Sequence, residues 1–163
     1  MTDFAALLQV LSHGAVEYIL VGGVAATAHG SARLTQDVDI VYARHPENLS
    51  RLVGALAPYK PYLRGAPPGL PFRWSIETLQ NGLNFTLTTS LGDLDLLGEI
   101  AGGGSFEDLL KDTIILRMFD IECHCVTLQR LIQLKRAAGR PRDLEAIAEL
   151  EAILEESRNT SSS

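Results

Sequence analysis

The sequence has few cysteines, a deficit of basic residues and no long apolar run. Its two cysteines, Cys123 and Cys125, alternate with His124 in an apolar stretch. That spacing is too close for an easy disulfide and offers too few ligands for a zinc site, so we interpret both as reduced thiols on a strand.

The 14 Lys and Arg residues are outnumbered by 20 Asp and Glu residues, for a net charge of −6. Any contact with nucleic acid must therefore depend on a local basic patch.

Segments that direct a chain to a membrane are also missing. The first 14 residues carry no basic region ahead of their apolar residues and no small-residue cleavage site. The apolar stretches are all shorter than the length that spans a bilayer. We therefore expect a soluble, cytoplasmic protein with no membrane partner.

What the sequence does have is enough apolar residues for one core. At 163 residues and 46% hydrophobic, it predicts a single domain over residues 1–156 and a disordered tail over residues 157–163. The predicted order is helix, strand, helix, strand, helix, a proline-rich loop over residues 58–74, two β-hairpins and a C-terminal pair of helices. This order is typical of an α+β (mixed α/β) domain with helices flanking a mixed sheet.

Asp37 and Asp39 stand one residue apart in a predicted strand, "LTQDVDIVY", residues 34–42. Side chains alternate along a strand, so both carboxylates project from the same face, with Cα atoms about 6.5–7 Å apart. A divalent cation between them would turn their repulsion into coordination, and Mg²⁺ suits oxygen ligands shared with phosphates. An exposed edge strand with two solvated acids is the alternative interpretation.

Two further features favour a metal site. The later strand "GDLDLL" carries Asp93 and Asp95 with the same alternation, so a neighbouring strand can supply the third carboxylate that a two-metal site uses. Gly22 and Gly23 lie where a strand hands over to a helix, and unhindered backbone N–H groups there can hold a polyphosphate. Tight packing explains a glycine pair equally well.

With these motifs in this order, the sequence resembles the nucleotidyltransferase superfamily. The signature is residues 21–23, "VGG", followed after a spacer by residues 37–40, "DVDI". Within the superfamily it is most similar to small bacterial proteins related to the AbiEii-type toxin transferases. They share "GDLDLL" at residues 92–97 and "KRAAGRPRDL" at residues 135–144. The resemblance extends from about residue 17 to residue 154.

The resemblance implies a minimal palm-like mixed sheet flanked by helices. It implies that Asp37, Asp39 and Asp95 are the catalytic acids and ligate Mg²⁺ or Mn²⁺. Asp95 is preferred to Asp93 because leucines flank it, as the hydrophobic-acid-hydrophobic pattern of the family requires. The residues alone leave the choice between these two acids open.

We expect Gly22, Gly23, Arg33 and Thr35 to belong to the nucleotide site. Arg33, two residues before Thr35, is a candidate phosphate contact, and a surface arginine is an equally good interpretation. Thr35 can bond locally to position the acidic strand. The resemblance adds Lys135 to this set. In this interpretation Lys135 contacts the triphosphate and Asp143 orients it through an ion pair. A solvated helix end, with cations that offset the helix dipole, is an equally good interpretation of the basic segment around Lys135.

The implied reaction is Mg²⁺-dependent transfer of a nucleoside monophosphate from an NTP, such as ATP, to a hydroxyl of a tRNA, a protein or a small molecule. Several relatives are toxins, so the resemblance extends to a toxin role with an antitoxin partner. The alternative is a non-catalytic protein that uses the same fold to bind a nucleotide or a partner. A dinucleotide-binding fold is disfavoured because "GGVAATAHG" lacks Gly-x-Gly-x-x-Gly.

Overall fold

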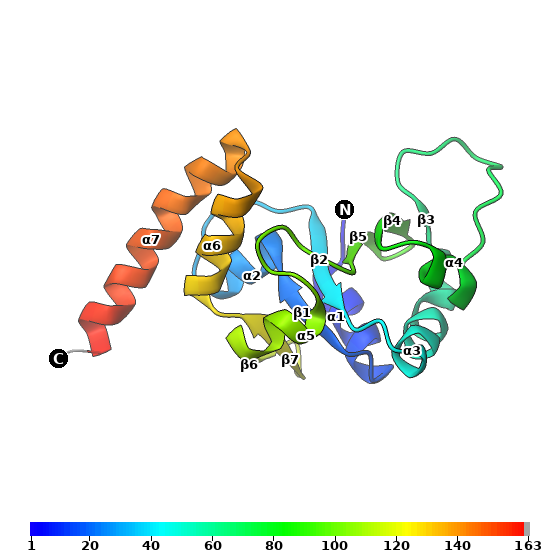
Figure 1. Cartoon of the computed structure of the whole chain (residues 1–163), viewed down its shortest axis with the longest axis horizontal. Coiled ribbons are helices and arrows are strands. Elements are labelled where there is room, and N and C mark those ends of the chain that lie inside the picture. Colours follow the sequence, from blue (N-terminus) through cyan, green and yellow to red (C-terminus); the bar gives the residue numbers. More distant parts are fainter. Residues whose placement is uncertain (162–163) are drawn as a thin grey trace.

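The two acid-rich segments form adjacent strands at the centre of a mixed sheet. They are β2 (Asp37–Tyr42) and β5 (Gly92–Leu97), which run parallel to each other. The computed structural model describes residues 1–161, and its strand order is β3-β4-β5-β2-β1-β7-β6 (Figure 1). The predicted mixed sheet flanked by helices, with a C-terminal helical pair, is confirmed.

Five further strands complete the sheet. They are β1 (Tyr18–Val21), β3 (Tyr62–Leu63), β4 (Asn84–Thr89), β6 (Thr113–Met118) and β7 (Ile121–Val126). β1 runs antiparallel to β2 and parallel to β7, whereas β3, β4 and β5 form an antiparallel set, as do β6 and β7. Each predicted hairpin is therefore present, and the second turns at Phe119 and Asp120, both of which have a positive φ.

The helices are short except for the last one. They are α1 (Phe4–His13), α2 (Gly22–Ala28), α3 (Pro46–Leu56), α4 (Ile76–Asn81), α5 (Phe106–Leu109), α6 (Leu128–Ala138) and α7 (Pro141–Ser161). Local chemistry sets their ends: the Asp3 carboxylate accepts from the Ala6 N–H at the start of α1, and Gly139, with φ of 66°, ends α6. Among the described residues, no helix combines the length and apolar character needed to cross a bilayer.

The register of β1 against β2 shows that α1 and α2 lie on opposite faces of the sheet. Val21 lies opposite Asp39 on the aspartate face, so Tyr18, three residues earlier in β1, points to the other face. The Tyr18 hydroxyl lies 2.8 Å from Ser12 Oγ, which places α1 on the face away from the aspartates. On the aspartate face, α2 begins beside Asp39 and contacts α6.

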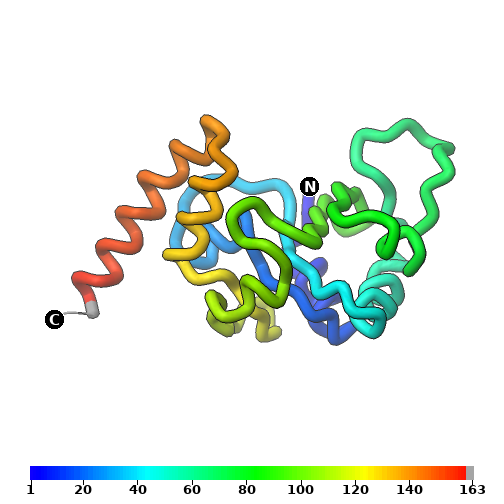
Figure 2. Tube along the Cα trace, viewed as in Figure 1, coloured from blue at the N-terminus to red at the C-terminus, as the bar shows by residue number. Residues whose placement is uncertain are grey.

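A hydrophobic core lies on both sides of the central strands. Its largest fully buried side chains include Leu7, Leu8, Leu11, Ile19, Leu20, Ile40, Tyr42, Leu49, Leu52, Leu56, Leu79 and Leu87. The α6–α7 pair stands at one end of the molecule and the long loop after β3 at the other, with β2 and β5 between them (Figure 2).

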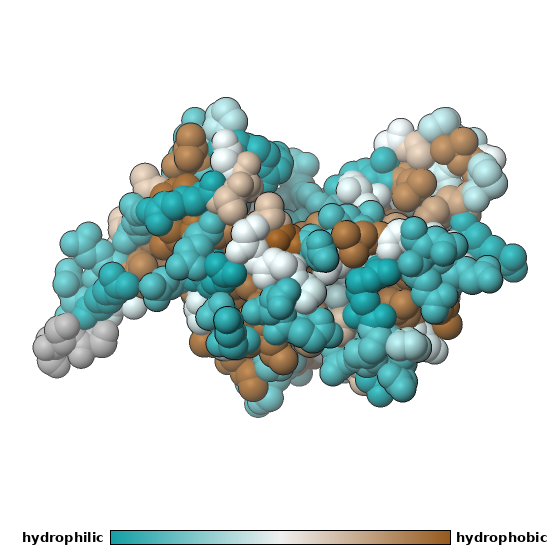
Figure 3. Space-filling view, in the orientation of Figure 1, coloured by the Kyte–Doolittle hydropathy of each residue, from teal (hydrophilic) through white to brown (hydrophobic). Residues whose placement is uncertain are grey.

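Two segments differ from the sequence prediction. The proline-rich loop contains the two-residue strand β3, because Tyr62 and Leu63 pair with β4, and so short a pairing leaves no pattern in the sequence. The predicted disordered tail began at residue 157, but α7 continues to Ser161, since a helix already anchored on α6 extends at little cost. The projecting end of α7 is largely hydrophilic (Figure 3). Residues 162 and 163 of that tail lie outside the described residues.

Candidate active site

The parallel register of β2 and β5 brings four acids together on one face of the sheet. Asp37 lies opposite Asp93, and Asp39 lies opposite Asp95. Because residues directly opposite each other share a face, all four carboxylates leave the sheet on the same side. A hydrophobic residue stands between the two acids of each strand and points into the core, as the buried Val38 does.

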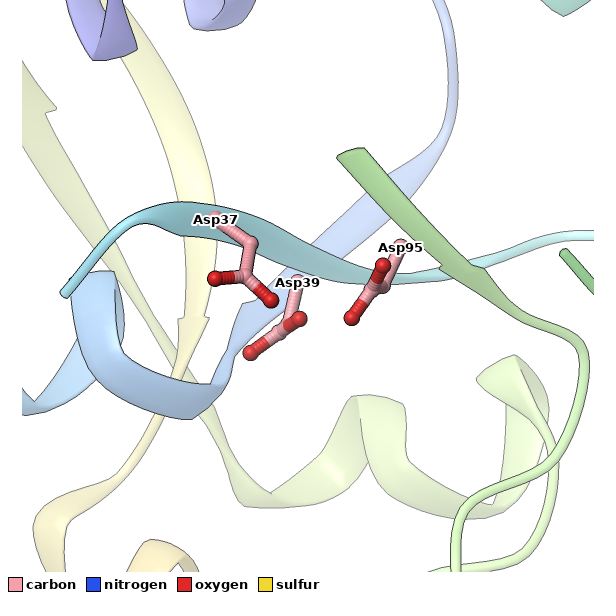
Figure 4. A group of neighbouring side chains, drawn as sticks. All are labelled: Asp37, Asp39 and Asp95. Carbon is pink, nitrogen blue, oxygen red and sulfur yellow. The ribbon is translucent and has the colours of Figure 1, made fainter. Parts of the chain in front are cut away.

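Three of these four carboxylates converge. Asp37, Asp39 and Asp95 each place one carboxylate oxygen so that the three oxygens lie within 4.8 Å of one another (Figure 4). Two oxygens on one Mg²⁺ lie at most about 4 Å apart, so small side-chain adjustments allow shared coordination. Asp95 Oδ1 is buried and accepts no hydrogen bond from the described residues, although Arg64 Nη2 lies 2.9 Å from it, so its lone pairs can serve a cation once Arg64 moves. The donor set therefore fits a divalent metal.

The protonation of this cluster reflects burial and mutual repulsion. Burial, then the hydrogen bond and charge of Asp95, then the charge of Asp37 raise the pKa of Asp39 to about 8, against a smaller opposing effect of Lys135. Burial and the charge of Asp95 also raise the pKa of Asp37, although Arg64 opposes them. Without a cation, the cluster therefore retains a proton at neutral pH.

Divalent-metal binding is expected to strengthen with pH between about 6 and 8 and then level off. A cation needs Asp39 ionised, so affinity should fall about tenfold per pH unit below the raised pKa. The raised pKa of Asp39 also stabilises the folded, metal-free protein at low pH. This contribution to the free energy of unfolding is lost as pH rises from near 4 through about 8. Isothermal titration at pH 6, 7, 8 and 9 measures the Mn²⁺ affinity. An affinity independent of pH would contradict the raised pKa of Asp39.

The start of α2 lies directly against the acidic strand. A Cβ at Gly22 would overlap the Asp39 carboxylate, and a Cβ at Gly23 would overlap the Thr35 hydroxyl. Gly22 also has φ of +66°, a conformation that favours glycine. Thr35 Oγ1 in turn donates to the Asp37 carbonyl over 3.3 Å. Both glycines are thus required for the close approach of α2 to β2. The sequence predicts that they end the preceding strand, whereas in the structure they are the first two residues of α2.

A buried carboxylate organises the basic residues between α6 and α7. Asp143 is 1% exposed; Lys135 Nζ lies 3.6 Å from its Oδ1, and Arg140 Nε donates to its Oδ2 over 2.6 Å. Burial raises the pKa of Asp143, but the hydrogen bond and charge of Arg140, with the charge of Lys135, outweigh it and lower the pKa overall. The expected pairing of Lys135 with Asp143 is therefore present in the structure.

Two cavities meet at the aspartate cluster. One, of about 390 Å³, reaches Thr35 and is polar; we call it the basic cavity after Arg33, Lys135, Arg140 and Arg142, although Asp37, Asp39, Asp143 and Glu149 also line it. The other, of about 260 Å³, is more apolar. The apolar walls of the second cavity come from Leu97, Ile100, Ala101, Leu131, Leu134 and Ala138. Asp37, Asp39 and Lys135 border both cavities, so an anionic group and an apolar group can reach the carboxylates from different sides.

Sequence reasoning missed one charged residue at the cluster. Arg64 places its guanidinium against three of the aspartates, with Nη2 2.9 Å from Asp95 Oδ1. Nothing in the proline-rich segment pointed to this, because the position of Arg64 depends on the short pairing of β3 with β4. Arg33, which sequence analysis did select, lies in the basic cavity and also forms a 3.6 Å ion pair with the exposed Glu145.

Comparison with known proteins identifies the fold. No protein-family model and no curated protein matches the sequence. The chain nevertheless has a nucleotidyltransferase-like fold, a mixed sheet with two C-terminal helices. It is similar to the crystal structure of the lincosamide antibiotic adenylyltransferase LnuA with lincomycin bound, at a TM-score of 0.59 and 17% sequence identity. The similarity covers 91% of this chain and 94% of that one, and at this identity it shows the fold.

Proposed function

We propose that this protein is a divalent-metal-dependent nucleotidyltransferase, which moves a nucleoside monophosphate from an NTP to a hydroxyl acceptor. The observation that carries the proposal is the convergence of Asp37, Asp39 and Asp95 where two cavities meet, one of them carrying Arg33, Lys135, Arg140 and Arg142. Mg²⁺ or Mn²⁺ bound by these three carboxylates would neutralise charge that builds on the α-phosphate. The nucleotidyltransferase-like fold supports the same reaction class.

The side chains of the site divide the work of this reaction. Attack of the acceptor oxygen on the α-phosphorus forms a new P–O bond, and the bond to the bridging oxygen breaks as pyrophosphate leaves with the electron pair. Lys135 and Arg140, held by Asp143, together with Arg33, Arg142 and the backbone at Gly22 and Gly23, hold the triphosphate and then the pyrophosphate. Asp95 orients the acceptor hydroxyl, whose proton passes to this carboxylate or to solvent.

The acceptor we favour is a small hydroxylated molecule. LnuA is described as an adenylyltransferase of a lincosamide antibiotic, and this chain matches nearly its whole length. The apolar walls of the 260 Å³ cavity suit a nonpolar part of the acceptor or the nucleobase. ATP is the favoured nucleotide because LnuA is described as an adenylyltransferase. A tRNA or protein acceptor, a toxin role and an antitoxin partner stay predictions from the AbiEii-type resemblance.

Transfer of the α-phosphate label, but not the γ-phosphate label, is expected when the protein is incubated with an NTP, Mg²⁺ and the right acceptor. The four NTPs, each labelled at either position, are tested with hydroxylated small molecules, total tRNA and cell-extract protein. EDTA should abolish transfer, because the carboxylates then lack their cation. Saturable NTP binding without α-label transfer to any acceptor class would contradict the enzyme and favour the binding-protein alternative.

A further inference from the structure

Arg64 reaches the aspartate cluster from outside the strands that carry it. It follows β3 directly and begins the long loop drawn at the right of Figure 1. Its backbone N–H donates to the Thr86 carbonyl over 3.0 Å, and its Nη2 donates to the Leu87 carbonyl over 2.7 Å. The backbone of Arg64 is therefore fixed to β4, while the side chain extends across β4 towards β5 and β2.

The guanidinium of Arg64 faces three carboxylates at once. Nη2 lies 2.9 Å from Asp95 Oδ1, Nε lies 3.5 Å from Asp93 Oδ2, and Nη1 lies 3.6 Å from Asp37 Oδ2. Yet Nε and Asp95 Oδ1 are both buried without a hydrogen bond to any described residue. Arg64 thus neutralises the cluster by charge and leaves the acceptor capacity of Asp95 unused, so the contact is electrostatic rather than a directed hydrogen bond.

We propose that Arg64 is an internal counter-ion of the metal-free site, which competes with a divalent cation for Asp37 and Asp95 and withdraws to Asp93 when the cation binds. The proposal rests on the metal site of the proposed function. An arginine keeps its charge at every physiological pH, so a divalent cation at the same oxygens must repel it. Asp93, already within 3.5 Å, is the partner to which the side chain can turn.

This assignment gives Asp93 a role distinct from Asp95. The strand register places both acids on the aspartate face of β5. Of these two, Asp95 belongs to the converging set found among the described residues, and Asp93 does not. Asp93 is then not a ligand but the carboxylate that keeps Arg64 away from the loaded site. Asp93 and Arg64 are positioning residues, because they act through the cluster and not on the substrate.

The test is isothermal titration of the whole protein with Mn²⁺ alone, without nucleotide or acceptor. Arg64→Gln should bind Mn²⁺ about tenfold more tightly than wild type, since a repelling charge is gone. Arg64→Lys, which keeps the charge, should stay near wild type, and so should Arg73→Gln in the same loop. Asp93→Asn should bind about threefold more weakly, because Arg64 then stays over Asp37 and Asp95.

The double variant Arg64→Gln, Asp93→Asn separates this proposal from direct ligation by Asp93. If Asp93 acts only through Arg64, its substitution has no effect once Arg64 is gone. Unchanged or weaker Mn²⁺ binding by Arg64→Gln overturns the proposal, as does an Asp93→Asn loss that persists in the double variant. Tighter binding by Arg64→Gln in a protein that transfers no nucleotide would reject the proposed function and leave this inference standing.

Discussion

Replacing Asp39 with asparagine is expected to lower the rate of nucleotidyl transfer by at least about a thousandfold. Burial and the neighbouring carboxylates raise the pKa of Asp39 to about 8, and its carboxylate lies between those of Asp37 and Asp95 (Figure 4). Asparagine keeps the shape but removes the charge that holds a cation. The metal-free variant should melt no lower than wild type at neutral pH, because the raised pKa of Asp39 already keeps this carboxyl protonated and asparagine is also neutral.

Asp93→Asn is the matched control for this experiment. It makes the same chemical change on the same face of the sheet, next to the converging set rather than in it. We expect Asp93→Asn to lose at most about tenfold in transfer rate, through Arg64. Equal losses for Asp39→Asn and Asp93→Asn, measured with α-labelled NTP under saturating Mg²⁺, would contradict the assignment of Asp39.

Gly22→Ala is expected to lower the free energy of unfolding by about 1–2 kcal/mol, because an L-residue is strained at φ of +66°. The added Cβ would also overlap the Asp39 carboxylate and must displace it. Mn²⁺ affinity should therefore fall together with stability. Urea denaturation and Mn²⁺ titration measure the two effects separately.

Gly54→Ala controls for the loss of a glycine. Gly54 lies within α3, its φ is not positive, and a Cβ there would meet no described atom within 4 Å. Alanine should raise the free energy of unfolding by about 0.5–1 kcal/mol, because it favours the helix over the unfolded chain. A Gly22→Ala variant as stable as wild type, with unchanged Mn²⁺ affinity, would contradict the close approach of α2 to β2.

Local periodicity was sufficient to predict the strands that carry the acids. Alternation predicted that Asp37 and Asp39 share one face of their strand and that Asp93 and Asp95 share one face of theirs, because side chains in a strand repeat every two residues. The parallel pairing of β2 with β5 is not a local property, since it depends on crossovers that pass through α3, β3, α4 and β4. The expected convergence of the acids therefore came from resemblance to a family, and the register of the sheet produces it here.

Arg64 shows why part of the site could not be predicted. Its approach to the acids depends on the two-residue strand β3 and on a side chain that crosses β4, and neither leaves a sequence pattern. By contrast, the break between α6 and α7 was predicted from one glycine and one proline, whereas the pairing of Lys135 with Asp143 across it was expected from the resemblance. Short-range chain geometry was predictable, whereas contacts between strands far apart in sequence were not.

In the proposed site, Asp37, Asp39 and Asp95 hold a divalent cation beside the phosphates of an NTP. Anomalous diffraction from crystals grown with Mn²⁺ and an ATP analogue that resists cleavage between its α- and β-phosphates tests it most directly. We expect a manganese peak about 2 Å from carboxylate oxygens of these residues, with the triphosphate in the basic cavity. A nucleotide bound elsewhere, or no manganese at these carboxylates, would contradict it.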